Sequence, residues 1–101
     1  TPIYRIYENP MDIAFDPEKS ARNEAQRGLP FSMVEGFIWE TALVATDDRF
    51  DYGEDRWIAI GYIGARLFVL VFTETEGGIR VISFRKANTR EAKRYAQATK
   101  S

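Results

Sequence analysis

The stretch from residue 57 to residue 86 constrains the fold more than any other part of the chain. Three runs in it are rich in β-branched and aromatic residues, which suit a pleated strand: residues 57–64, 66–73 and 78–86. Gly64-Ala65 suits a two-residue hairpin turn, and the second connection, residues 74–78, ends in two glycines that tolerate positive φ. We therefore predict three antiparallel strands in sequence order.

The faces of these strands differ. The middle run is apolar on both faces from Leu67 to Phe72, so we expect a central strand that is covered on both sides. In a regular strand, the last run would carry Ile79, Val81, Ser83 and Arg85 on one face and Arg80, Ile82, Phe84 and Lys86 on the other. Such mixing is typical either of a functional surface or of a strand whose ends reach water.

The rest of the chain contains helix signals and two further strands. Asp16 as N-cap and Gly28 as terminator predict a helix over residues 17–27, and the S-x-x-E pair Ser32 and Glu35 predicts a second one. Asn88 and Glu91 form a similar pair before a closing helix over residues 89–99. Residues 12–15 and 41–46 read as strands, and residues 47–55 as an acidic loop.

These elements predict one α+β domain in the order β-α-α-β-β-β-β-α. We expect an antiparallel sheet of four to five strands with two N-terminal helices and one C-terminal helix. The 101 residues suffice for a single core. Residues 1–11 are interpreted as an N-terminal extension and residues 12–101 as the domain. No run approaches the roughly 20 apolar residues of a membrane span, so we expect no membrane association.

The chain contains no cysteine and no histidine. Disulfides and thiolate metal sites are therefore excluded, which fits a cytoplasmic protein. The commonest general base and the commonest metal ligand are also missing. The acidic loop lacks the glycine and terminal glutamate of an EF-hand, so we predict no metal and no cofactor.

Charge is unevenly distributed along the chain. Residues 77–101 contain seven basic residues and one acidic residue, a net charge of +6, whereas residues 1–76 carry −7. A basic final strand and helix suggest a surface for a polyanion or for an acidic protein partner. The same split also arises by chance in helical tails.

The residues permit arginine-based phosphate chemistry. Arg56, Arg80 and Arg85 can present guanidinium groups to a phosphodiester, because arginine binds phosphate bidentately and keeps its charge. Proton carriers would have to come from Glu54, Glu91 or Tyr95. Each has a structural alternative: Glu91 as a helix cap, Tyr95 as a core residue and Glu54 as a loop charge. No phosphate loop or Ser-His arrangement is present.

Several blocks of sequence resemble the BrnT toxin family. The quoted blocks are Phe15-Asp-Pro-x-Lys19, Asn23, Arg27-Gly-Leu-Pro-Phe31, Glu54-x-Arg56, Gly61, Arg80-Val-Ile-Ser-Phe-Arg-Lys-Ala87, Arg90-Glu91 and Tyr95. The resemblance covers roughly residues 12–97 and is most specific in the block that begins at Arg80. Two positions depart from the family pattern: Arg27 replaces a frequent histidine, and Phe84 replaces the usual alanine. Phe84 would serve either as core or as a base-stacking platform.

The resemblance implies a RelE-like, metal-independent endoribonuclease, the toxin of a type II toxin–antitoxin module, which stops translation. It also implies a BrnA-type antitoxin that neutralises the toxin, RNA as substrate, and contact with operator DNA only through the antitoxin. We predict a catalytic set of Glu54, Arg56, Arg80, Arg85 and Glu91. We predict RNA-binding residues Lys19, Arg22, Lys86, Arg90 and Tyr95. The alternatives are a binding module without catalysis, which docks an acidic protein or nucleic acid, and a purely structural domain.

Overall fold

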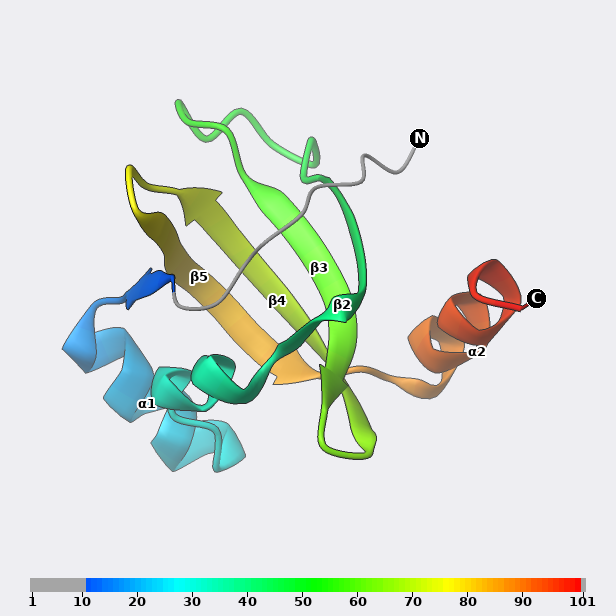
Figure 1. Ribbon diagram of the computed structural model, residues 1–101. Helices are drawn as coiled ribbons and strands as arrows, with labels where there is room; N and C mark the ends of the chain where they lie inside the picture. The colour runs from blue at the N-terminus through cyan, green and yellow to red at the C-terminus, as the bar shows by residue number, and fades with distance from the viewer. Residues whose placement is uncertain (1–10, 101) are drawn as a thin grey trace.

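The computed structural model describes residues 11–100, and five strands within this range form one sheet (Figure 1). The elements in chain order are β1 (Asp12–Ala14), α1 (Pro17–Arg27), η1 (Phe31–Gly36), β2 (Ile38–Thr46), β3 (Trp57–Ile63), β4 (Arg66–Glu74), β5 (Gly78–Lys86) and α2 (Thr89–Ala98). The strand order across the sheet is β1-β5-β4-β3-β2. The predicted extension over residues 1–11 lies, apart from Met11, outside the described residues.

The prediction of an α+β domain is confirmed, but the prediction of an antiparallel sheet is wrong. β1 pairs with β5 in parallel, from Asp12 opposite Gly78 to Ala14 opposite Arg80, whereas the other neighbouring strands are antiparallel. The sheet is therefore mixed. The difference depends on a three-residue strand whose partner lies more than sixty residues away, and no local pattern encodes the direction of such a pairing.

The three strands from residue 57 to residue 86 form as predicted. β3 and β4 are joined by the two-residue turn, with Gly64 at a φ of 60°, and β4 lies in the middle of the sheet. All five residues from Phe68 to Phe72 are buried. Side chains on both faces of β4 are thus covered, as its unbroken apolar run indicates.

The alternation predicted for β5 is interrupted by a bulge. Ser83 pairs with Val71 and Val81 pairs with Phe72, so Ile82 is an extra residue in the ladder. Ile79, Val81 and Phe84 consequently point to the same core, where each is at most 2% exposed. The register places Arg80, Ser83 and Arg85 together on the opposite face. The sequence-based assignment, which put Arg80 and Arg85 on different faces, is therefore wrong.

The second predicted helix is a six-residue 3-10 helix, η1. Its N-cap is Pro30 rather than Ser32, and no side chain caps it. The amide of Phe37 donates to the carbonyl of Val34, the i to i+3 bond typical of short, tight turns. Because β2 begins at Ile38, three residues earlier than predicted, the chain has no room for a longer helix.

Helices α1 and α2 begin as their caps predict. The Asp16 side chain accepts a hydrogen bond from the Glu18 amide, and Gly28 ends α1 with a φ of 72°. Asn88 and Glu91 form a complete capping box at the start of α2. Within residues 11–100, no helix has the length and apolar character needed to cross a membrane.

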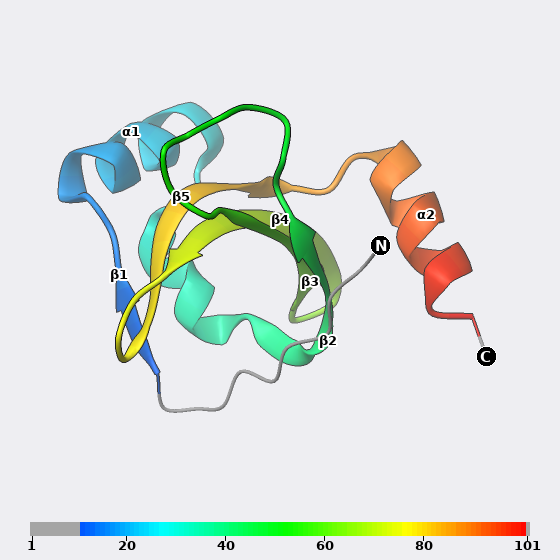
Figure 2. The ribbon, with the colours of Figure 1, turned by 90° about the horizontal axis from the view of Figure 1, so that it is seen from above.

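The sheet curves around η1, while α2 and the loop between β2 and β3 lie outside the curve (Figure 2). The inner core contains Leu29, Phe31, Val34, Phe37, Trp39, Val44, Trp57, Ala59, Phe68, Leu70, Phe72, Ile79, Val81 and Phe84. α1 packs beside β5, past the point where the short β1 ends. The side-chain amide of Asn23 in α1 donates to the carbonyls of Phe84 and Leu29 at 2.9 and 2.7 Å. The outer face therefore carries the polar side chains of β5 that the core excludes.

We expect Gly78→Ala to disrupt the pairing of β1 with β5. A Cβ atom at Gly78 would lie within 3 Å of three Asp12 backbone atoms, and backbone cannot rotate away as a side chain can. The free energy of unfolding should fall by about 1–3 kcal/mol, the usual cost of overpacking. Urea unfolding measures the loss, and hydrogen exchange at Ile13 should accelerate. Gly36→Ala is the control, because its Cβ would meet Ile63 at an ordinary 3.5 Å. Equal stability of both variants would contradict the expectation.

Candidate RNA-cleavage site

A cluster of two arginines around one carboxylate lies where the loop over residues 47–56 reaches β5. Nη2 of Arg80 lies 3.1 Å from Oε1 of Glu54, and Nε of Arg56 lies 3.1 Å from Oε2 of the same carboxylate. The Arg56 guanidinium also stacks over the Tyr52 ring, 4.0 Å from its centroid. The Arg80 side chain is 45% exposed and that of Glu54 33%, so the cluster is open to solvent.

The loop itself is held by Asp47, a buried residue that the sequence analysis did not single out. Its carboxylate accepts hydrogen bonds from Nε and Nη2 of Arg49 at 2.7 and 2.9 Å, and from the Tyr52 hydroxyl at 3.3 Å. The Asp47 amide donates to the carbonyl of Arg56 at 2.8 Å. The bonds from Arg49 lower the pKa of Asp47 despite its burial. Asp47 thus fixes the loop that presents Glu54 and Arg56.

A second ion pair joins β5 to α2. Nη1 and Nη2 of Arg85 bind the two oxygens of Glu91, each at 2.8 Å. Oε1 of Glu91 also accepts a hydrogen bond from the backbone amide of Asn88 at 2.9 Å, which completes the capping box. The hydrogen bonds from Arg85 lower the pKa of Glu91 to about 2. A group with so low a pKa is a poor general base at neutral pH, so the geometry assigns Glu91 to positioning Arg85 and capping α2.

The guanidinium groups that the sequence analysis offers to a phosphodiester are already bound to acidic side chains. Arg56, Arg80 and Arg85 lie on one side of the molecule, but each binds a carboxylate. A carboxylate offers a guanidinium the same two-oxygen geometry that a phosphate offers. A phosphodiester that binds these guanidinium groups would therefore compete with Glu54 or Glu91 for them. For exposed pairs such as Arg80 and Glu54 this costs roughly 0–1 kcal/mol, since water already screens the attraction.

The predicted RNA-binding residues are dispersed. Lys86 and Arg90 are exposed near the junction of β5 and α2, whereas Lys19 and Arg22 lie on α1. Tyr95 is only 8% exposed, packs edge-on against Tyr62 and donates its hydroxyl to the Thr41 carbonyl. Burial raises its pKa. Tyr95 therefore has the core position that the sequence analysis left open as an alternative.

The two departures from the family pattern also have structural positions. Phe84 is fully buried and stacks on Phe68 with ring centroids 5.2 Å apart, so it belongs to the core and offers no face to an RNA base. Nη1 of Arg27 donates to the carbonyl of Phe84 at 3.3 Å and to Oδ1 of Asn23 at 3.4 Å. Arg27 thus joins the end of α1 to the edge of β5.

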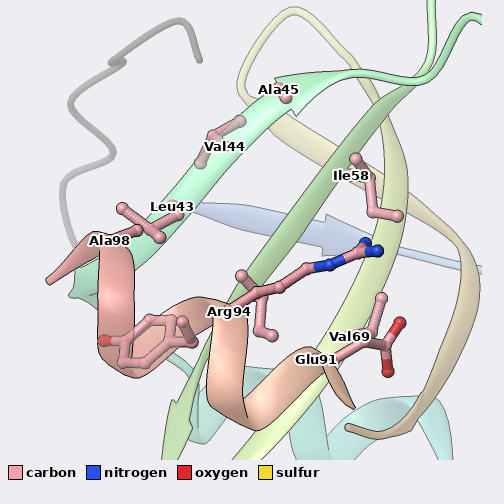
Figure 3. Close-up of a pocket in the computed structure, with 10 residues that line it drawn as sticks. Leu43, Val44, Ala45, Ile58, Val69, Glu91, Arg94 and Ala98 are labelled. Carbon is pink, nitrogen blue, oxygen red and sulfur yellow. The ribbon is translucent and has the colours of Figure 1, made fainter. Parts of the chain in front are cut away.

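An apolar pocket of about 260 Å³ separates α2 from the outer face of the sheet (Figure 3). Its floor comes from three strands, and the Arg94 side chain extends across it in the direction of Ile58. The lining residues are Leu43, Val44, Ala45, Ile58, Ile60, Val69, Glu91, Arg94, Tyr95 and Ala98. Tyr95 is the buried residue of α2, so this helix covers the sheet only in part.

We expect Glu91→Gln to lower stability at neutral pH and to leave it unchanged in strong acid. Glutamine keeps the capping acceptor but loses the charge that binds Arg85. The folded pKa of about 2 lies below the ordinary 4.5, so this contribution is complete above pH 4.5 and is lost as pH falls towards 2. After allowance for solvent screening it amounts to about 1–2 kcal/mol. Urea unfolding from pH 2 to 7 measures it, with exposed Glu35→Gln as control; a constant difference across this range would contradict the assignment.

One of three comparisons with known proteins finds a match, to a protein family. The family model described as "Ribonuclease toxin, BrnT, of type II toxin-antitoxin system" matches residues 15–91, a range that includes both ion-pair clusters. A search of curated proteins finds no match. A search of solved structures finds none either. The matched range is well over half of the chain, and the chain therefore belongs to the BrnT family of ribonuclease toxins of type II toxin–antitoxin systems.

Proposed function

We propose that the outer face of β5 is the centre at which this toxin cleaves RNA, without a metal ion. The observation that carries the proposal is the bulge at Ile82, which brings Arg80 and Arg85 to one face beside the loop that bears Glu54 and Arg56. Guanidinium groups can stabilise the charge that develops on a pentacoordinate phosphate, usually the largest electrostatic term in such catalysis. A RelE-like fold, a cytoplasmic location and inhibition of translation through RNA cleavage are parts of the same proposal.

In this proposal a phosphodiester displaces Glu54 from Arg80 and stays within reach of Arg85. The 2′-oxygen forms a bond to phosphorus, the bond to the 5′-oxygen breaks, and a 2′,3′-cyclic phosphate results. Glu54 takes the proton of the 2′-hydroxyl, and the 5′-oxygen takes one from solvent. Glu54 is favoured over Glu91 as the base because the pKa of Glu91 is about 2.

Arg80→Ala and Arg85→Ala should each reduce the rate of RNA cleavage by about 10²–10³, the usual effect of removing one preorganised donor from a transition state. The assay uses purified protein, end-labelled single-stranded RNA and EDTA, and scores products with cyclic phosphate ends. Arg66→Ala is the control, because Arg66 is exposed and the alternation along β4 places it on the opposite face of the sheet from Arg80 and Arg85. Unchanged cleavage by both variants would refute the arginine mechanism, and loss of cleavage with EDTA would refute metal independence.

The alternative function is a binding module without catalysis. Two observations favour it: the chain has no histidine, and the guanidinium groups of Arg56, Arg80 and Arg85 already bind acidic side chains. In this alternative the basic surface only docks RNA or an acidic protein. The same assay at low salt separates the two functions, because salt-sensitive binding without products supports the module.

We propose that a BrnA-type antitoxin inserts an apolar side chain into the pocket beneath α2. The pocket has an almost wholly apolar floor, and Arg94 at its rim suits a neighbouring carboxylate of the partner. Such a partner would also contact Glu91, which lines this pocket and forms the ion pair with Arg85. In this proposal the toxin approaches operator DNA only as part of its complex with the antitoxin.

Ala98→Trp should weaken antitoxin binding at least tenfold, because an indole at the pocket rim occupies the space that the partner needs. Ala98 is exposed, so the substitution should not disturb folding. Ala96→Trp is a matched control, since Ala96 is also exposed on α2 but does not line this pocket. Titration calorimetry with the cognate antitoxin measures the difference. Equal affinities of the two variants would exclude the pocket as the docking site.

A further inference from the structure

A second, polar pocket of about 250 Å³ lies between α1 and β5. It is distinct from the ion-pair clusters, and most of its lining comes from one face of α1, where residues three and four apart in the sequence are neighbours. Its lining residues are Lys19, Arg22, Asn23, Gln26, Arg27, Phe31, Ile82 and Ser83. Nearly every polar side chain among them is a hydrogen-bond donor, as an anion requires.

The charge in this pocket is not neutralised. Three of its lining residues are cations and none is acidic. Within residues 11–100, no carboxylate lies within ion-pair distance of Lys19 or Arg22, whereas Arg80 and Arg85 each hold one. Like charges placed side by side repel one another, so a pocket of this kind gains free energy when an anion enters. The α1 pocket is therefore ready to bind an anion without first breaking an ion pair.

The pocket is held in place by hydrogen bonds that cross from α1 to the segments around it. Asn23 donates to the carbonyls of Leu29 and Phe84, and Arg27 donates to Phe84 as well. The buried Ser20 hydroxyl accepts the amide of Phe31 at 2.9 Å, which fixes the chain after the helix. These bonds hold α1 in a fixed position relative to β5. Binding therefore requires little reorganisation, which favours affinity.

The pocket is continuous with the proposed cleavage face. Ser83 lines it and, by the register of β5, lies on the same face as Arg80 and Arg85, between them in the strand. An RNA strand that crosses β5 near Arg85 would therefore pass the mouth of the α1 pocket. Arginine, lysine, amide and hydroxyl donors are the groups that bind phosphate oxygens in nucleic-acid complexes.

We propose that the α1 pocket binds one backbone phosphate of the RNA, next to the phosphate that is cleaved. This inference rests on the proposed function, because it takes the occupant to be the RNA substrate. Lys19, Arg22 and Arg27 neutralise the phosphate, and Ser83 donates a hydrogen bond. The pocket anchors the RNA before the phosphodiester competes with Glu54 for Arg80.

The test measures binding of a fluorescent 12-nucleotide 2′-O-methyl RNA, which lacks the nucleophile and cannot be cleaved. The double variant Lys19→Gln/Arg22→Gln should bind about tenfold more weakly at low salt. Its plot of log affinity against log salt should be shallower by about 0.7, the value for one lost phosphate contact on a single strand. Ser83→Ala should weaken binding about threefold to tenfold without changing this slope, because no charge is lost. Arg66→Gln, which removes an exposed charge from the opposite face of the sheet, is the control.

Each outcome decides the proposal independently of catalysis. If the double variant and Arg66→Gln bind RNA with equal affinity and slope, the α1 pocket is not a phosphate site. If the double variant loses binding to a glutamate-rich peptide but keeps binding to RNA, the pocket recognises carboxylates and the proposal is also overturned. Absence of cleavage by the wild type would refute the proposed function alone, since binding of the uncleavable RNA is measured separately.

Discussion

The bulge at Ile82 is the constraint on which the rest of the molecule depends. Ile79, Val81 and Phe84 are nearly or completely buried, and each such side chain contributes about 1.5–3 kcal/mol to stability. A regular strand could not bury all three on one face, because its side chains alternate. The bulge costs at most one or two ladder hydrogen bonds, worth about 1 kcal/mol each, so burial prevails. The position of Arg80 and Arg85 on a shared face is a consequence of core packing.

Among the described residues, ion pairs neutralise only two of the seven basic side chains between residues 77 and 101. Arg80, from the basic C-terminal part, binds Glu54, from the acidic N-terminal part, and Arg85 binds the acidic residue of its own segment, Glu91. The other five basic residues of this part are exposed, so folding covers little of its positive surface: Lys86, Arg90, Lys93, Arg94 and Lys100. Positive charge without an ion pair also occurs on α1, where Lys19 and Arg22 project from a helix in the part of the chain with negative net charge. The net charge of a segment thus does not locate every basic surface of the fold, because α1 carries one within the acidic part of the chain.

Features encoded within a few neighbouring residues could be predicted from the sequence. Examples are the helix caps at Asp16 and Asn88, the helix end at Gly28 and the turn at Gly64. Each of these features depends only on residues close by in the sequence, such as a side chain that binds a free backbone group at a helix end, and therefore does not require the rest of the fold. The capping pattern at Ser32 failed because the start of β2 ends the helix after six residues. Of the candidate site, the sequence identified its arginines and glutamates. It missed Asp47, whose importance comes from burial beneath a loop.

The sequence by itself determined the three-stranded centre of the sheet, two helices and membership of a toxin family, because strand propensity, caps and motif residues are local properties. Only the tertiary structure decided the parallel pairing of β1, the shared face of Arg80 and Arg85, and the ion pairs that occupy their guanidinium groups. Each of these depends on contacts between segments distant in the chain. The free energy of these interactions is gained only when the distant segments pack together, so no short stretch of sequence specifies them.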